Sequence, residues 1–215
     1  MRQLLTIFLL ILFNICYSQI DTKADFKISK FNLFSKLITD SPNDYLIKKI
    51  NPASNYKYWE YVRVSPLEKE QKLDTKIIVF NGDKLKYADT ISQIKSLSGF
   101  FYDCFPDMNC FNYIRAITEN DSIELIDTET KFIKFIGTIQ NIEEASLIIK
   151  LNGYGVDNID KKIGSFRETK DSFYLYLLEE KKCTQKTIRA ILYKTGEFIV
   201  IDNNIYKQIK PCMNY

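Results

Sequence analysis

The chain contains no histidine among its 215 residues. Histidine is the usual general base at neutral pH and a common metal ligand. Its absence excludes Ser-His-Asp and Cys-His mechanisms as well as H-E-x-x-H zinc hydrolysis. The sequence also lacks G-x-S-x-G, the phosphate-binding G-x-x-x-x-G-K-[ST] pattern and a D-x-D-x-D-G calcium loop. We therefore expect neither a cofactor nor a metal site.

Glycine and long hydrophobic runs are also scarce. Only 7 glycines occur, and Gly153-Tyr154-Gly155 follows an expected helix instead of a strand, so it indicates a turn and not a dinucleotide fingerprint. With 46% hydrophobic and 14% aromatic residues, the composition is that of a folded globular protein. Apolar stretches such as residues 77–80 and 198–201 have the length of strands. No later segment approaches the roughly 20 apolar residues of a membrane helix, so we expect no integral membrane segment in the mature chain.

The amino terminus has the pattern of a secretory leader. Arg2 supplies a positive charge, residues 4–15 are apolar except for a threonine and an asparagine, and Cys16-Tyr17-Ser18 places small side chains before a cut at Gln19. This pattern predicts that residues 1–18 are a cleaved signal peptide and that the protein is exported, to the periplasm or outside the cell. A lipoprotein anchored at Cys16 is the alternative, but Asn14-Ile15 fit its cleavage site poorly.

Neither sign of charge dominates. The full chain carries 30 basic and 27 acidic residues, and removal of Arg2 with the leader leaves 29 against 27, a net charge of +2. The lysine pairs are isolated, as at residues 48–49 and 161–162. A nucleic-acid-binding protein usually has a basic stripe, and we therefore expect no nucleic-acid partner.

Four cysteines remain after the leader is removed, and an even number in an exported chain indicates disulfides. Four cysteines allow three pairings. The short turn between Cys104 and Cys110 favours that bond, which leaves Cys183 and Cys212 to pair with each other. A zinc site is the alternative, but the chain has no C-x-x-C spacing and no histidine.

The first half of the mature chain has helix signals followed by strand signals. Ile28, Phe31, Phe34 and Ile38 recur near the helical period, which predicts a first helix ending before Pro42. A second helix is expected between Pro42 and Asn51. Residues 56–64 and 76–80 favour strands, residues 84–98 are ambiguous, and residues 113–127 favour a hairpin.

The second half has clearer boundaries. Thr128 to Ile136 favours a short helix ended by Gly137, and Asn141 caps a helix that runs to Leu151. Four strands follow, near residues 164–169, 172–180, 186–193 and 197–202, with tight turns between them. This is an α+β pattern: N-terminal helices, then mixed strands, and a C-terminal helix packed on an antiparallel four-stranded meander. In topology only, it is similar to cystatin-like folds. We expect residues 19–215 to form a single domain, with 19–99 and 100–215 as possible subdomains.

Pairs of carboxylates keep a histidine-independent hydrolase open as a function, because two carboxylates can cleave a glycosidic bond. The pairs close in sequence are Glu143 with Glu144, Glu179 with Glu180, and Glu68 with Glu70. Glu143 and Glu144 have a simpler interpretation, since acidic side chains stabilise a helix N-terminus. A Ser–Lys dyad is also compatible with the composition, but no motif supports it.

Aromatic residues suggest binding. Tyr56, Tyr58, Trp59 and Tyr61 lie on one expected strand, where alternation puts the first two on one face and the last two on the other. We interpret one face as core and the other as either ordinary packing or a possible binding patch.

The sequence therefore predicts a non-catalytic exported binding protein, whose ligand is an unknown protein or carbohydrate. Two alternatives stay open: an inhibitor or immunity-type protein that acts on an enzyme, and the hydrolase with paired carboxylates.

Overall fold

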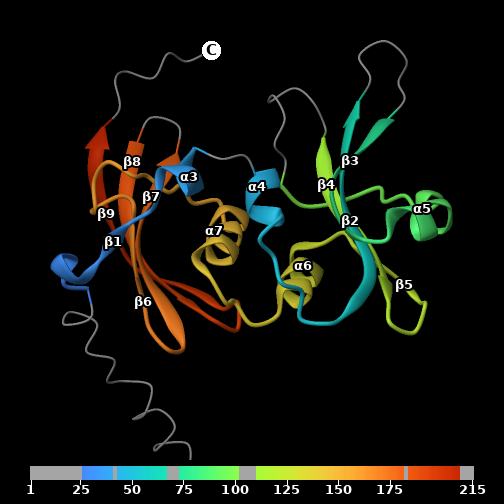
Figure 1. Cartoon of the computed structure of the whole chain (residues 1–215). Coiled ribbons are helices and arrows are strands. Elements are labelled where there is room, and N and C mark those ends of the chain that lie inside the picture. The colour runs from blue at the N-terminus through green and yellow to red at the C-terminus, as the bar shows by residue number, and fades with distance from the viewer. Residues whose placement is uncertain (1–25, 41–42, 67–72, 102–109, 182–183, 209–215) are drawn as a thin grey trace, which may run out of the picture.

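Two antiparallel sheets enclose a layer of helices (Figure 1). The computed structural model describes residues 26–40, 43–66, 73–101, 110–181 and 184–208. The expected leader, residues 1–18, lies outside these ranges. In Figure 1 the five-stranded sheet stands on the left, the four-stranded sheet on the right, and helices α4, α6 and α7 lie between them.

The five-stranded sheet contains the expected meander. Its strands β6, β7, β8 and β9 follow one another in sequence and in space, and each pairs antiparallel with the next. A short strand from the N-terminal region, β1, pairs with the outer edge of β6, which was not expected from the sequence. The strand bounds are β1 (Asn32–Leu33), β6 (Ser165–Glu168), β7 (Ser172–Lys181), β8 (Thr184–Tyr193) and β9 (Phe198–Gln208).

The four-stranded sheet has the order β3-β2-β4-β5. The hairpin expected at residues 113–127 is present as β4 and β5, and β2 is the long aromatic strand. Helix α5 (Lys84–Ser92) follows β3 and covers the outer face, the face turned away from the other sheet. The strand bounds are β2 (Tyr56–Pro66), β3 (Leu73–Gly82), β4 (Phe111–Thr118) and β5 (Ile123–Ile126).

The helices between the sheets begin at the residues that the sequence indicates. The Thr128 hydroxyl accepts a hydrogen bond from the Lys131 N–H at 3.3 Å and begins α6 (Glu129–Ile136), and Gly137 ends it with a positive φ of 71°. The Asn141 side chain accepts from the Glu144 N–H at 2.8 Å and begins α7 (Ile142–Leu151). Helix α4 (Asn43–Ile47) packs on α7. No helix in the described ranges has the length and apolarity to cross a membrane.

One hydrophobic core joins the two sheets. It contains inward-facing residues of both sheets and the buried sides of α4, α6 and α7, so the α+β fold is confirmed. The boundary suggested at residue 99 separates β2 from β4, which are neighbours in one sheet. A fully buried Leu, Ile or Phe contributes about 1.5–3 kcal/mol. Examples from each layer are Leu177, Ile188, Phe132, Ile148 and Ile114.

The N-terminal region differs from the expected long helix. Residues 26–34, here called the N-terminal arm, form one 3-10 turn, η1 (Ile28–Lys30), and the short strand β1. A four-residue helix, α3 (Lys36–Thr39), follows. The apolar residues that suggested a helical stripe contact different surfaces: Phe31 packs on the outer face of the five-stranded sheet, whereas Phe34 belongs to the core. Tertiary contacts therefore override the local helical period.

Candidate functional site

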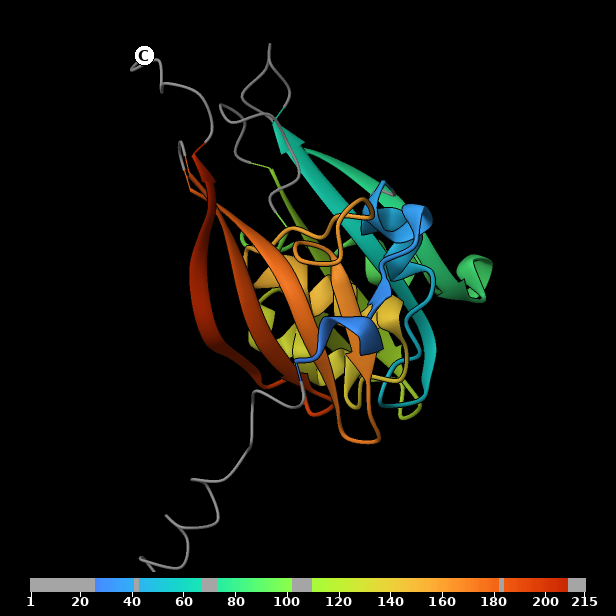
Figure 2. The same ribbon diagram turned by 90° about the vertical axis from the view of Figure 1, so that its left-hand side faces the viewer.

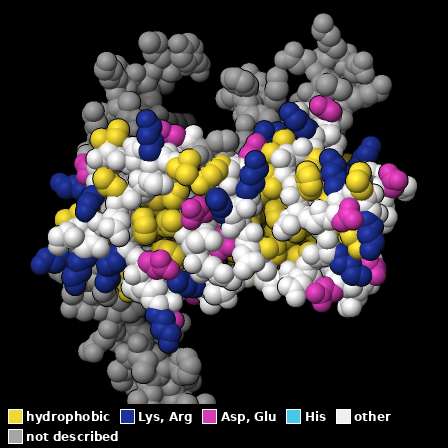
Figure 3. Space-filling model, in the orientation of Figure 1, with side chains coloured by type: hydrophobic (Ala, Val, Ile, Leu, Met, Phe, Trp, Pro, Cys, Tyr) yellow, Lys and Arg dark blue, Asp and Glu magenta, His cyan; other side chains and the backbone are white. Residues whose placement is uncertain are grey.

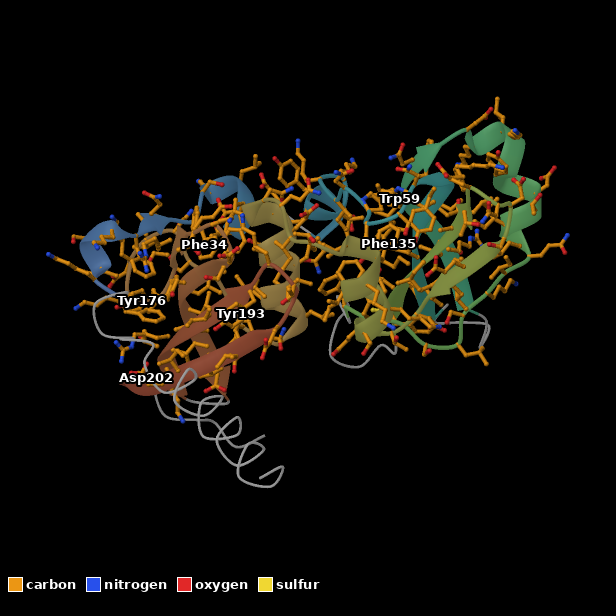
Figure 4. All side chains as sticks on the ribbon, turned by 90° about the horizontal axis from the view of Figure 1, so that it is seen from below. Phe34, Trp59, Phe135, Tyr176, Tyr193 and Asp202 are labelled. Atoms are coloured by element: carbon orange, nitrogen blue, oxygen red, sulfur yellow. The ribbon has the colours of Figure 1, made fainter. Side chains whose placement is uncertain are left out.

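The four aromatic residues proposed as a binding patch lie on β2, where both faces of the sheet are covered. Tyr58, Trp59 and Tyr61 are at most 3% exposed, and Tyr56 is half-buried. A register shift between Tyr56 and Tyr58 places Tyr56 on the same side as Trp59, contrary to simple alternation. The rings of these two residues lie 5.3 and 5.5 Å from the Phe135 ring of α6 (Figure 4). The interpretation as ordinary packing accounts for this strand, which offers little exposed aromatic surface.

The other side of β2 holds a buried polar network beneath α5. The Tyr58 hydroxyl donates to Glu60 Oε2 at 2.5 Å, and Arg115 Nε donates to Glu60 Oε1. Arg115 Nη1 also donates to the carbonyl oxygens of Ser92 and Ile94, at 3.2 and 2.6 Å. Burial, together with the bond to Glu60, raises the pKa of Tyr58. The network therefore fixes the C-terminal end of α5 to the sheet.

Glu144, one of the carboxylates considered for hydrolysis, has a structural role at the start of α7. It is completely buried, and its two oxygens accept backbone N–H groups from Asn51 at 2.9 Å and from Gln140 at 2.7 Å. The carboxylate thus connects the chain before β2 to the N-terminus of α7, where the helix dipole favours a negative charge. Its neighbour Glu143 is only partly buried.

The other carboxylate pairs and most cysteines lie partly or wholly outside the described residues. Glu68 and Glu70 fall in a range that the structure does not describe, as does the side chain of Glu180. Cys104, Cys183 and Cys212 are also outside, and Cys110 is buried at the start of β4. The proposed disulfide pairings stay a prediction.

A surface that the sequence reasoning missed is the outer face of the five-stranded sheet. Figure 2 shows this face toward the viewer, with the N-terminal arm crossing in front of its strands. Alternation along β7 turns Phe173, Leu175 and Leu177 inward and Tyr174 and Tyr176 outward. That alternation was readable in the sequence; the position of the arm was not. We call this surface the tyrosine face, and it consists of Arg167, Tyr174, Tyr176, Arg189, Ile191, Tyr193, Ile201 and Asp202.

The arm is held on the tyrosine face by rings and by hydrogen bonds to its main chain. Phe26 and Phe31 are 4% and 1% exposed, and the Tyr176 ring meets both edge-on, at centroid distances of 5.7 and 5.0 Å. The Tyr176 hydroxyl donates to the Phe26 carbonyl oxygen at 2.7 Å, and Lys161 Nζ donates to the Phe31 carbonyl oxygen at 2.5 Å. The face, together with Lys161, therefore binds a short segment of the chain that includes the 3-10 turn η1, through aromatic anchors and side-chain donors.

An ion pair lies beside the arm. Arg189 donates to both carboxylate oxygens of Asp202, with Nε at 2.8 and 3.0 Å from them, and the guanidinium lies 5.3 Å from the centroid of the Phe26 ring. The Arg189 hydrogen bonds lower the pKa of Asp202, while burial raises the pKa of Tyr176. The two charged side chains are 28% and 30% exposed, so the pair faces partly to solvent. Figure 4 shows Tyr176, Tyr193 and Asp202 along this side of the sheet.

On the face of the molecule shown in Figure 3, neither sign of charge dominates. Figure 3 shows lysines and arginines together with acidic side chains, and hydrophobic side chains reach the surface between them. Within the described ranges, no three acidic, cysteine or histidine side chains are grouped in a way that would hold a metal ion. Compared with protein families, curated proteins and solved structures, the chain shows no match.

Proposed function

We propose that the protein is an exported binding protein that recognises a protein partner through the tyrosine face. The leader pattern supports export. The observation that supports binding is that the face already holds a short segment, the N-terminal arm, by its aromatic rings and by side-chain donors to main-chain carbonyl oxygens. The same groups fit a short peptide segment of a partner, because tyrosine combines apolar area with a hydroxyl and loses little side-chain entropy on binding.

The part of the face beyond the arm is the proposed contact. Tyr193, Ile201 and Asp202 are each partly exposed, and the Asp202 charge is balanced by Arg189. A surface with aromatic and aliphatic side chains and a neutralised charge can be dehydrated at lower cost than one with an unpaired charge. This favours a protein partner with apolar side chains over a strongly charged ligand.

A pull-down from the exported fraction tests this function. Tagged mature protein is compared with Tyr193→Ser, which removes an aromatic ring from the tyrosine face, and with Phe80→Ser, which removes a half-exposed ring from the outer face of the other sheet. We expect the Tyr193 variant to lose a specific partner that the Phe80 variant retains, with both variants folded by circular dichroism. Equal capture by both variants would contradict the proposed surface.

Export itself is tested by mass spectrometry of the protein recovered outside the cytoplasm. We expect a mature chain that begins near Gln19 and contains disulfides Cys104–Cys110 and Cys183–Cys212 by non-reducing peptide mapping. An intact Met1 or a lipid-modified Cys16 contradicts the leader assignment. A peptide that links Cys104 to Cys183 contradicts the pairing, and four free thiols contradict the argument from the oxidising compartment.

An inhibitor or immunity-type function is the second proposal, and exposed leucines near α5 favour it. Leu85 and Leu97, at the start of α5 and just beyond its end, are 95% and 90% exposed. One protruding apolar side chain on α5 and a second in the segment that follows the helix suit insertion into an enzyme. If Leu85→Ser with Leu97→Ser abolished capture of an enzyme while Tyr193→Ser did not, this function would replace the first.

A further inference from the structure

The two sheets have four edges in the described part of the chain, and three of them are poor sites for pairing with another strand. The edge strands β1 and β5 have only 2 and 4 residues. The edge strand β3 carries the exposed charges of Asp74 and Lys76 and lies beside α4. Short strands, charged side chains and β-bulges are among the devices by which proteins prevent unwanted edge pairing.

The fourth edge, β9, has none of these devices before Ile201, where a register shift against β8 marks a β-bulge. The strand has 11 residues, and among the described residues it pairs only with β8. Phe198, Ile199, Val200 and Ile201 form an uncharged apolar run, and Val200 is 39% exposed. Figure 2 shows β9 at the border of the sheet, on the side away from the N-terminal arm. A long apolar edge of this kind is a template for a further strand.

The direction of the backbone groups on β9 follows from the turn before it. The Tyr193 N–H donates to the Glu197 carbonyl oxygen at 2.8 Å, and Ile191 lies opposite Ile199. Because hydrogen-bonded and non-hydrogen-bonded pairs alternate in an antiparallel ladder, Ile199 bonds to β8. The N–H and C=O groups of Phe198 and Val200 therefore point away from β8, toward the free edge.

We propose that two copies of this chain pair through β9, antiparallel and centred on Ile199. In this register Phe198 of each copy lies opposite Val200 of the other, so their outward N–H and C=O groups satisfy one another in four hydrogen bonds. Ile199 lies opposite itself as a non-hydrogen-bonded pair, where side chains are closest. The two sheets then form one sheet of five plus five strands.

The register also keeps like charges apart. Phe198, Ile199 and Val200, which form the pairs of this register, carry no charge, and the bulge at Ile201 lies outside them. The same strand on both copies supplies complementary groups, which is the requirement for a twofold contact. A contact of a few residues buries less area than a permanent dimer needs, so the dimer depends on protein concentration. This inference is independent of the proposed partner of the tyrosine face.

Sedimentation of the mature chain over a range of concentrations tests the pairing. We expect a reversible monomer–dimer equilibrium. Val200→Pro removes an outward N–H without removing a bond to β8, and the loss of two symmetric hydrogen bonds should weaken the dimer at least tenfold. Val200→Thr keeps the N–H and the branched side chain and should change the dissociation constant by less than about threefold.

A cysteine variant gives an independent readout if the proline variant fails to fold. Cα atoms of a non-hydrogen-bonded antiparallel pair are about 4.5 Å apart, within the range that a disulfide bridges. Ile199→Cys should therefore form a covalent dimer under mild oxidation, identified by a peptide joined to itself through residue 199. Lys194→Cys, in the turn before β9, should not. A wild-type chain that is monomeric at every concentration, or a dimer that forms no link at residue 199, would overturn the proposal.

Discussion

The outer faces of the two sheets hold the same three kinds of side chain at different depths. On the four-stranded sheet, Tyr58, Glu60 and Arg115 lie beneath α5 and are at most 4% exposed. On the five-stranded sheet, Tyr176, Arg189 and Asp202 lie beside the N-terminal arm, and the charged pair is about one-third exposed. The difference shows that the element covering a sheet, more than the residues on it, decides how deeply an ion pair is buried.

The largest expected effect comes from breaking the buried pair. Arg115→Ala leaves Glu60 without its cation in a site closed to water and removes the donors that hold the Ser92 and Ile94 carbonyl oxygens. We expect a loss of about 3–5 kcal/mol in the free energy of unfolding, measured by urea denaturation. The double variant Arg115→Met with Glu60→Gln removes both charges and should recover part of that loss. A single variant within about 0.5 kcal/mol of wild type would contradict the importance of burial.

A variant of Glu144 tests the effect of burying a carboxylate apart from the effect of an ion pair. The contacts described for this carboxylate are backbone N–H groups. Glutamine at this position has one acceptor oxygen and turns its NH2 group toward the second N–H donor. Glu144→Gln should therefore destabilise by about 1–3 kcal/mol. A residue that only complemented the helix N-terminus, the interpretation that the sequence favours, would show a smaller effect of about 0.3–1 kcal/mol.

The matched control for this measurement is Asn141→Ala, which removes only the cap of α7. It should cost about 0.5–2 kcal/mol. If Glu144→Gln were neutral while Asn141→Ala followed this range, the buried carboxylate would not be the link between α7 and the chain before β2.

On the outer face of the five-stranded sheet, Tyr176→Phe removes the hydroxyl that donates to the Phe26 carbonyl oxygen and keeps the ring contacts. We expect a loss of about 0.5–1.5 kcal/mol, the usual contribution of one hydrogen bond. Hydrogen exchange should increase in the N-terminal arm and leave α7 unchanged. Faster exchange throughout the molecule would indicate that the arm is part of the main folding unit.

The smallest effect is expected from Asp202→Asn. Arg189 lowers the pKa of Asp202, so the ion pair stabilises the fold fully above about pH 4 and is lost as the pH falls through the lowered pKa. Because the pair is partly exposed, the contribution is at most about 1 kcal/mol and decreases with added salt. Unfolding of wild type and variant should therefore differ near neutral pH and converge in acid. A constant difference at all pH values would exclude the ion pair as its cause.

The helix and strand boundaries of the second half were predictable because their signals are local. Thr128 and Asn141 cap α6 and α7 with their own side chains, and the turn between β8 and β9 contains Gly196, whose φ is 93°. The candidate surface was only partly predictable. Alternation identifies Tyr174 and Tyr176 as facing away from Phe173 and Leu175. The sequence of a strand does not indicate which distant segment covers its outward face.

The sequence by itself determined the absence of histidine chemistry, the α+β order of elements and the amphipathic strands of the meander, since these depend on composition and on side chains close together in the chain. Only the tertiary structure decided that the aromatic residues of β2 are buried on both faces, because α5 and α6 cover them from positions far along the chain. The tertiary structure also decided the conformation of the N-terminal arm. Phe26 and Phe31 contact Tyr176, about 150 residues away in the sequence. These contacts stabilise the arm more than a helix would, because a short isolated helix is only marginally stable.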